Sequence, residues 1–275
     1  MKLLISFLMI FQMICTNVEF YGKSYIVYDS LNQYVVEGKS YIVMEASNQV
    51  VIEGSNEDYI QSVASISKIM TAIVVIENSR LDKKITVDET INKAYGSCVY
   101  IHIKDRITIQ DLLYGLMLRS GNDCALMLAK SIGGSVERFV EMMNEKARDI
   151  GMKQTHFSNP SGLDEEDEGN LSTVKEMAIL YRYCCQNPLF NQIVKTKEYK
   201  RLDGKGYWHN KNRLLKEYPY CVGGKTGYTK KAKRTLITRA IKKQVDLIIV
   251  TFNCGNAIFN GIPGKPAPVP ISMIR

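Results

Sequence analysis

A serine and a lysine three residues apart, Ser65 and Lys68, begin an apolar stretch that runs to Glu77. Residues three apart share one face of a helix, so the hydroxyl and the amine are expected to meet. A serine hydroxyl becomes nucleophilic when a base takes its proton, and lysine serves as that base when burial or another cation keeps it neutral. The S-x-x-K pattern is common, so it indicates covalent catalysis only where other motifs support it.

Two further motifs follow in the chain. Ser120-Gly121-Asn122 is expected at a helix end, and Lys225-Thr226-Gly227 is expected in a strand near the end of the sequence. Either triplet alone is weak evidence. The ordered set S-x-x-K, S-x-N and K-T-G is a known signature of enzymes that form an acyl-serine intermediate.

Helices are expected to position the first two motifs. Thr108 is a candidate cap for a helix with Ile109, Leu112, Leu113, Leu116 and Met117 on one face, ending at 119–122. A second helix is expected over about 123–132, and a third begins after Ser135 and closes at Gly151. Thr173 is a candidate cap for the next helix, which Asn187-Pro188 is expected to terminate.

Strands are expected at both ends of the sequence. Residues 23–38 and 39–54 are two copies of an internal repeat, each of which reads as a β-hairpin. The second copy leads into the Ser65 helix and should join the main sheet, whereas the first is expected as an edge hairpin or a separate arm. Further strands are expected over 221–228, 234–241 and 245–252. This order predicts an α+β fold, an antiparallel sheet with an inserted helical cluster.

The composition is that of an ordinary globular chain of 275 residues, 45% hydrophobic and 23% charged, with a net charge of +8. No basic run interleaved with aromatic residues is present, so we expect no nucleic-acid partner. The first 15 residues carry one lysine and then an apolar run of signal-peptide length. We therefore expect an exported protein, with residues 1–21 as a signal peptide or N-terminal anchor and with peripheral association with the membrane.

The cysteines and histidines indicate neither a disulfide framework nor a metal site. The seven cysteines are scattered, and most are expected as buried free thiols. The three histidines lie far apart and no C-x-x-C is present. We expect no metal and no cofactor.

Over about residues 39 to 254 the chain resembles the low-molecular-weight penicillin-binding proteins, which are serine D-alanyl-D-alanine carboxypeptidases of bacterial cell-wall metabolism. The segments that carry the resemblance are 64–72, 112–123, 155–163, 210–215 and 224–229. The resemblance implies a β-lactamase/transpeptidase-like fold, with 22–254 as the catalytic domain. It also implies peptidoglycan stem peptides as substrates and β-lactam antibiotics as inhibitors.

The same resemblance implies a role for each motif residue. Ser65 would be the nucleophile, Lys68 its proton acceptor, and Ser120 a bridge between Lys68 and Lys225 that protonates the departing amine. Asn122 would hold the acyl-side amide of the substrate.

The third motif would bind the substrate. Lys225 and Thr226 would bind the free carboxylate, and Gly227 would let the substrate lie against the strand as an added β-strand. The backbone N–H groups of Ser65 and Tyr228 would form an oxyanion hole.

Two alternatives stay open at this point. A serine β-lactamase would use the same nucleophile and would need a glutamate that activates water, for which Glu165 and Glu166 are candidates. A truncated, inactive penicillin-binding remnant is the other, because the irregular tail over 255–275 holds four of the seven prolines and cannot form a helix. Residues 247–252 are apolar on both faces, so an uncovered sheet face and reduced stability are expected.

Overall fold

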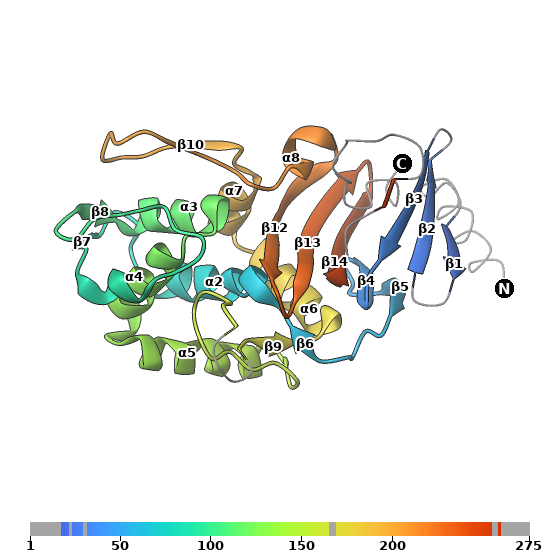
Figure 1. Cartoon of the computed structure of the whole chain (residues 1–275), viewed down its shortest axis with the longest axis horizontal. Helices are drawn as coiled ribbons and strands as arrows, with labels where there is room; N and C mark the ends of the chain where they lie inside the picture. Colours follow the sequence, from blue (N-terminus) through green and yellow to red (C-terminus); the bar gives the residue numbers. More distant parts are fainter. Residues whose placement is uncertain (1–17, 22–23, 30–31, 165–168, 255–257, 260–275) are drawn as a thin grey trace. The chain divides into compact units, whose positions relative to one another are not determined.

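The main sheet joins strands from the start and the end of the sequence. The computed structural model describes residues 18–21, 24–29, 32–164, 169–254 and 258–259 (Figure 1). The strand order is β12-β13-β14-β4-β5, with β4 Ser40–Glu45, β5 Val51–Ser55, β12 Cys221–Thr229, β13 Lys233–Lys242 and β14 Val245–Cys254. The β12–β13, β14–β4 and β4–β5 pairings are antiparallel. The expected strands, including those of the second hairpin copy, are therefore confirmed.

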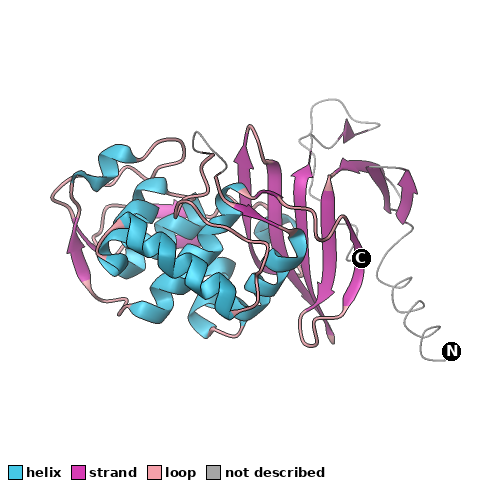
Figure 2. Cartoon of the chain, turned by 90° about the horizontal axis from the view of Figure 1, so that it is seen from below, coloured by secondary structure: helices cyan, strands magenta, loops and turns pink. Residues whose placement is uncertain are grey.

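The helical cluster lies between β5 and β12 in sequence and beside the sheet in space (Figure 2). Its helices are α2 Lys68–Asn78, α3 Ile109–Arg119, α4 Asn122–Gly133, α5 Val136–Asp149, α6 Val174–Cys185, α7 Pro188–Lys195 and the short α8 Leu214–Glu217, with 3-10 turns η1 Ala64–Ser67 and η2 Glu89–Lys93. Alternate β14 residues Ile248, Val250 and Phe252 belong to the same buried core as the helices. The predicted α+β architecture is thus confirmed.

Side-chain caps explain where most of these helices begin. Thr108, Ser135 and Thr173 each accept a hydrogen bond from the backbone N–H three residues ahead, as the sequence predicts. The prediction for Asn187-Pro188 is only half right. Helix α6 ends before this pair, but Asn187 then caps α7 and Pro188 occupies its first turn. Proline suits that position because its missing N–H has no partner within a helix.

A short hairpin that the sequence analysis missed is anchored on α3. Strands β10 Glu198–Lys200 and β11 Tyr207–His209 pair with each other. The Asp111 carboxylate, 1% exposed, accepts hydrogen bonds from Thr108 Oγ1, Tyr199 Oη and the Leu202 backbone N–H, each at 2.9 Å. This carboxylate therefore joins the start of α3 to the loop of the hairpin. Two more short pairings are β6 Gln61–Ser62 with β9 Leu171–Ser172, and β7 Lys84–Thr86 with β8 Arg106–Thr108.

The chain divides into two compact units, one of residues 40–252 and one of 1–39 with 253–275. In the second of these, β1 Val18–Tyr21, β2 Ser24–Asp29, β3 Asn32–Glu37 and β15 Ile258–Phe259 form a sheet in the order β1-β2-β3-β15. The first hairpin copy thus belongs to a sheet of its own. The predicted domain limits at 21/22 and 254/255 adjoin residues outside the described ranges and stay a prediction.

The expectation of an uncovered face on β14 is wrong. Leu247 and Ile249 are each 4% exposed, and Ile248 and Val250 are fully buried, so both faces of the strand are packed. Most of the tail, over 260–275, lies outside the described residues. The reduced stability inferred from that tail stays a prediction.

Replacing Asp111 by alanine should destabilise the 40–252 unit by about 3 kcal/mol, because three donors lose their shared acceptor and two of them lie in or beside the hairpin. Urea unfolding at constant m-value measures the change. Asp82→Ala is the matched control, since its ion pair with Arg80 is exposed, and it should cost less than about 0.5 kcal/mol. Equal losses in the two variants would contradict the anchoring role of Asp111.

Candidate active site

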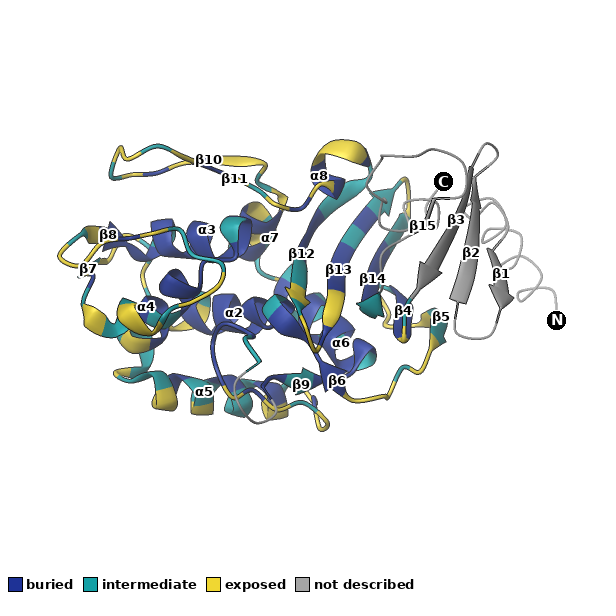
Figure 3. Ribbon diagram, in the orientation of Figure 1, coloured by how far each residue is buried: buried dark blue, intermediate teal, exposed yellow. Residues whose placement is uncertain are grey.

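The candidate nucleophile lies in a strained turn at the start of a buried helix. Ser65 belongs to η1, and α2 begins three residues later at Lys68. Ala64, immediately before it, has a φ of 52°, a left-handed conformation that non-glycine residues rarely adopt. The first two turns of α2, residues 68–75, are buried on every side, so the helix crosses the core (Figure 3). Packing on all faces fixes the Ser65 turn.

Lys68 connects the first two motifs. Its Nζ lies 3.1 Å from Ser65 Oγ and donates to Asn122 Oδ1 at 2.7 Å. It also donates to the backbone carbonyl of Ser161. The side chain is fully buried, and burial, reinforced by the positive charge of Lys225, holds the pKa of Lys68 well below its usual range. The neutral amine that a proton acceptor needs is thereby favoured.

The third motif meets the second through Ser120 and Lys225. Ser120 ends α3 in the left-handed conformation (φ 63°, ψ 35°), and its Oγ lies 3.1 Å from Lys225 Nζ. Lys225 Nζ also donates to the Thr226 carbonyl at 2.7 Å. Burial first, and the charge of Lys211 second, lower the pKa of Lys225 to about 7.

The expected bridge from Ser120 to Lys68 is absent from the described hydrogen bonds. Ser120 contacts Lys225, whereas the third position around Lys68 Nζ is taken by the Ser161 carbonyl. In this structure Lys225 therefore acts on Lys68 through its charge, and a proton passing from Lys68 to Ser120 would need a rearrangement or an intervening group.

Gly227 is required by the turn that carries Ser65. A Cβ atom at position 227 would lie 2.4 Å from Thr235 Oγ1 and 3.0 Å from the Ser65 backbone nitrogen. Strand β12 can therefore approach the Ser65 turn only with glycine at this position. Tyr228 follows with a side chain that is 61% exposed, and Thr226 is half-buried. Strand β12 is an edge strand of the main sheet, and among the described strands only β13 pairs with it.

Residues 158–163 complete the site, although the sequence analysis assigned them no role. Besides Ser161, the Pro160 carbonyl accepts from Thr71 Oγ1 at 2.7 Å, so two adjacent carbonyls of this loop contact α2. The available signal was the turn sequence Asn-Pro-Ser-Gly at 159–162. A backbone carbonyl leaves no trace in a side-chain motif, and for that reason its contact was missed.

Two further charged residues support the motifs. Asp123, 3% exposed, accepts from the backbone N–H groups of Val99, Tyr100 and Ile101 and so holds this segment over the start of α4. Lys211 Nζ lies 3.4 Å from Ser97 Oγ, and its charge lowers the pKa values of both Lys225 and Lys68.

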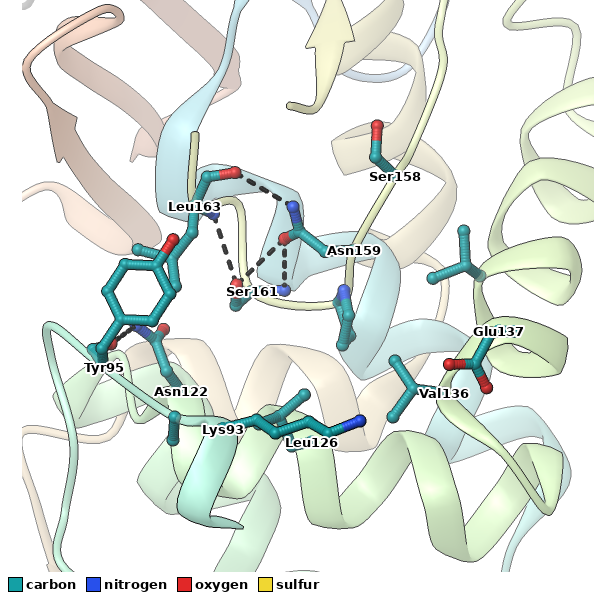
Figure 4. A pocket seen from close by; sticks show the side chains of 13 residues that line it. Lys93, Tyr95, Asn122, Leu126, Val136, Glu137, Ser158, Asn159, Ser161 and Leu163 are labelled. Atoms are coloured by element: carbon teal, nitrogen blue, oxygen red, sulfur yellow. Dashed lines mark hydrogen bonds between the residues drawn. The ribbon is translucent and has the colours of Figure 1, made fainter. Parts of the chain in front are cut away.

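A cavity of about 390 Å³ is lined in part by Asn122 and by residues of the 158–163 loop (Figure 4). Its lining includes Lys93, Asn122, Glu137, Asn159 and Ser161. Within the described ranges no group of three or more His, Cys, Asp or Glu side chains is placed to hold a metal ion. Likewise, none of the helices described is both long and apolar enough to cross a membrane.

The chain is similar to a known protein family and to solved structures. The sequence profile of the family described as D-alanyl-D-alanine carboxypeptidase matches residues 28–256. The D-alanyl-D-alanine carboxypeptidase DacF of Bacillus subtilis is 36% identical over 197 residues, which are 69% of this chain and 50% of the relative. DacB2 of Mycobacterium tuberculosis is 34% identical over 188 residues, 68% of this chain and 64% of the relative. The matched part of the chain thus spans half to two thirds of these relatives.

Solved structures show the same fold. A D-alanyl-D-alanine carboxypeptidase of M. tuberculosis superposes with a TM-score of 0.75 at 29% identity, covering 86% of this chain and 87% of that one. A mutant of a Streptomyces DD-transpeptidase gives a TM-score of 0.74 at 29% identity, covering 79% of this chain and 91% of that one.

Replacing Gly227 by alanine should slow acylation of the site by a β-lactam at least about 100-fold, because the added methyl displaces the Ser65 turn or β12. Stopped-flow acylation kinetics measure the change. The control is Gly54→Ala, whose methyl would meet only the flexible Glu57 side chain. An acylation rate for Gly227→Ala equal to that of Gly54→Ala would show that close packing at 227 is not needed.

Proposed function

Because this chain belongs to the D-alanyl-D-alanine carboxypeptidase family, we propose that it removes the terminal D-alanine from peptidoglycan stem peptides through an acyl-enzyme on Ser65. The observation that carries the proposal is the contact between Ser65 Oγ and a fully buried Lys68 amine at 3.1 Å. Its pKa is depressed, so this lysine is suited to accept the serine proton near neutral pH. The family relationship favours the carboxypeptidase over the β-lactamase alternative.

Acylation forms one bond and breaks another. Ser65 Oγ attacks the carbonyl between the two D-alanines as its proton passes to Lys68, and a C–O bond forms. The oxyanion of the tetrahedral intermediate accepts hydrogen bonds from the Ser65 and Tyr228 backbone N–H groups. The C–N bond then breaks, and the amine of the departing D-alanine takes the proton that Lys68 received, passed through Ser120 after a rearrangement that brings the Ser120 hydroxyl to Lys68. The acyl group remains on Ser65, and Lys68 is neutral again.

Deacylation reverses the roles with water as nucleophile. Water adds to the ester carbonyl while a proton passes to the base, the C–O bond to Ser65 breaks, and the serine recovers its proton. The products are the shortened peptide and free D-alanine. Asn122 holds the acyl-side amide of the peptide while its Oδ1 holds Lys68.

The substrate is recognised by its free chain end. Lys225 and the Thr226 hydroxyl bind the C-terminal carboxylate, which a protonated lysine attracts by a charge-assisted hydrogen bond. The unpaired edge of β12 receives the peptide backbone as an added strand, supported by the place of β12 at the end of the sheet order.

The proposed substrate places the enzyme outside the cytoplasmic membrane. The apolar run over residues 4–15 supports export, although it lies outside the described residues, and the net charge of +8 supports peripheral contact with anionic surfaces. β-Lactam antibiotics are the proposed inhibitors, because their strained amide imitates the D-alanyl-D-alanine end. The same export and substrate support a role in cell-wall synthesis and cell shape.

Penicillin should acylate Ser65 with close to one adduct per chain, and Ser65→Ala should show no label. Mass spectrometry of the intact chain and of its peptides gives the stoichiometry and the position. Ser67→Ala, two residues away, is the control and should keep the label on Ser65. An adduct on another serine would refute the assignment, and no adduct on the parent would favour an inactive remnant.

The lifetime of this adduct separates the two enzyme alternatives. A carboxypeptidase should hold the penicilloyl group for many turnovers of its peptide substrate. Release as fast as acylation would instead indicate a β-lactamase.

Preference for a carboxylate end should decline as pH rises through about 7, the value to which the pKa of Lys225 is lowered. Below that pH Lys225 is charged and attracts the carboxylate, and above it the charge is lost. The measurement is the ratio of kcat/KM for a peptide acid to that for its amide, which cancels the requirement for neutral Lys68.

Lys211→Gln should move this decline to higher pH, because removal of the neighbouring positive charge lets the pKa of Lys225 rise. Lys216→Gln is the matched control: this lysine is exposed on α8 in the same segment, and its loss should leave the midpoint in place. A midpoint that stays fixed in Lys211→Gln would assign the pH dependence to another group.

A further inference from the structure

The hydrogen-bond partners of Lys68 match the donors and the lone pair of a neutral amine. A neutral lysine has two N–H donors and one lone pair, in place of the three donors of the ammonium. Two of its three partners, Asn122 Oδ1 and the Ser161 carbonyl, can only accept, and each therefore takes one N–H. The third partner is the Ser65 hydroxyl, which is left facing the lone pair. The Ser161 carbonyl is thus as necessary to the direction of the lone pair as Asn122.

We propose that the buried Asn159 amide is a positioning residue that fixes the Ser161 carbonyl and thereby aims the lone pair of Lys68 at Ser65. This inference rests on the proposed function, since it concerns how the proposed base receives the serine proton.

The Asn159 side chain, 5% exposed, is surrounded by the peptide groups that it orders (Figure 4). Its Oδ1 accepts from the Ser161 N–H at 3.1 Å, from Ser161 Oγ at 2.9 Å and from the Gly162 N–H at 2.7 Å. Its Nδ2 donates to the Leu163 carbonyl at 3.0 Å. The peptide unit that begins with the Ser161 carbonyl ends with the Gly162 N–H, so the shortest of these bonds sets the direction of that carbonyl.

Asn159 is itself held by a second buried asparagine. Asn170 Oδ1 accepts from the Asn159 N–H at 3.1 Å, and Asn170 Nδ2 donates to the Asn159 carbonyl at 2.9 Å. On the other side of the peptide, Gly162 has a φ of 78°, and a Cβ there would lie 2.0 Å from the Ala64 carbonyl. The loop is therefore packed closely against the Ser65 turn beside the peptide that carries the Ser161 carbonyl.

The charged surroundings of Lys68 leave the carbonyl contacts to decide its orientation. The largest charge effects on the Lys68 amine come from Lys225 on β12, Cys124 on α4, Lys211 and Cys98, none of which is a carboxylate. The hydrogen bonds described for the amine likewise go to Ser65, Asn122 and Ser161 and to no carboxylate. A carbonyl that accepts from Lys68 stabilises the ammonium more than the amine, and its loss should lower the pKa of Lys68 further.

Two variants at position 159 should move the pH dependence of penicillin acylation in opposite directions. The acid limb of the pH–rate profile is the fall in acylation rate at low pH, where Lys68 becomes protonated, and its midpoint follows the pKa of Lys68. Asn159→Ala releases the Ser161 carbonyl, so this limb should move to lower pH. The rate on the plateau above it should fall roughly 10- to 100-fold, because the lone pair loses its direction. Asn159→Asp keeps the acceptor for all three donors and loses only the donor to the Leu163 carbonyl, so the plateau should fall less than in Asn159→Ala. Its added negative charge near Lys68 should move the limb to higher pH.

Asn144→Ala is the matched control for these variants. Its Nδ2 donates to the Phe157 carbonyl at 2.7 Å and its Oδ1 accepts from the Phe157 N–H at 2.9 Å, immediately before the 158–163 loop. These hydrogen bonds involve neither Ser161 nor Gly162. This variant should keep the parental midpoint. If Asn159→Ala does not fold, Asn170→Ala, which removes the support of Asn159 without adding a charge, should move the midpoint in the same direction as Asn159→Ala, and a parental midpoint there would overturn the inference.

The outcomes separate this inference from the proposed function. If the folded Asn159 variants keep the parental midpoint of the acid limb and differ from the parent only in the fraction of active molecules, Asn159 has a structural role. That result would overturn this inference and leave the proposed function standing. The same would follow if Asn144→Ala reproduced the shifts. A parent chain that penicillin does not acylate would overturn the proposed function and the inference together.

Discussion

Complete burial of the Lys68 amine is the constraint on which the rest of the site depends. An ammonium in the core is strongly disfavoured, and here the largest charge effect on it comes from a second buried lysine, Lys225. Both effects favour the neutral amine. The core that surrounds α2 therefore does more than stabilise the fold, because it creates the proposed base beside Ser65.

The remaining elements position partners around that amine. Helix α3 ends at Ser120 and α4 begins at Asn122, so one turn supplies a contact to each of the two buried lysines. Strand β12 brings Lys225, and its glycine allows close packing on the Ser65 turn. The loop over 158–163 closes the opposite side with backbone carbonyls. Elements far apart in sequence thus supply the contacts of the two buried lysines.

Side-chain motifs and helix caps made much of this arrangement predictable. Ser65, Lys68, Ser120, Asn122 and Lys225 do come together, and Thr108, Ser135 and Thr173 do begin helices. What the sequence could not reveal was carried by the backbone or by distant packing. Any residue type can supply a backbone carbonyl, so the sequence does not mark the one at Ser161. The Ser120 contact depends on which of the two lysines is nearer. Pro188 is equally compatible with the end of one helix and the start of the next. The two buried faces of β14 likewise follow from tertiary packing.

The protonation state of Lys68 tests the central claim most directly. An NMR titration of the lysine Cε carbons, with the Lys68 signal identified by its absence in Lys68→Ala, reports this state without any substrate. The account predicts that the Lys68 amine loses its proton at a pH well below that of an ordinary lysine side chain. A Lys68 signal that titrates together with the exposed lysines would contradict the account.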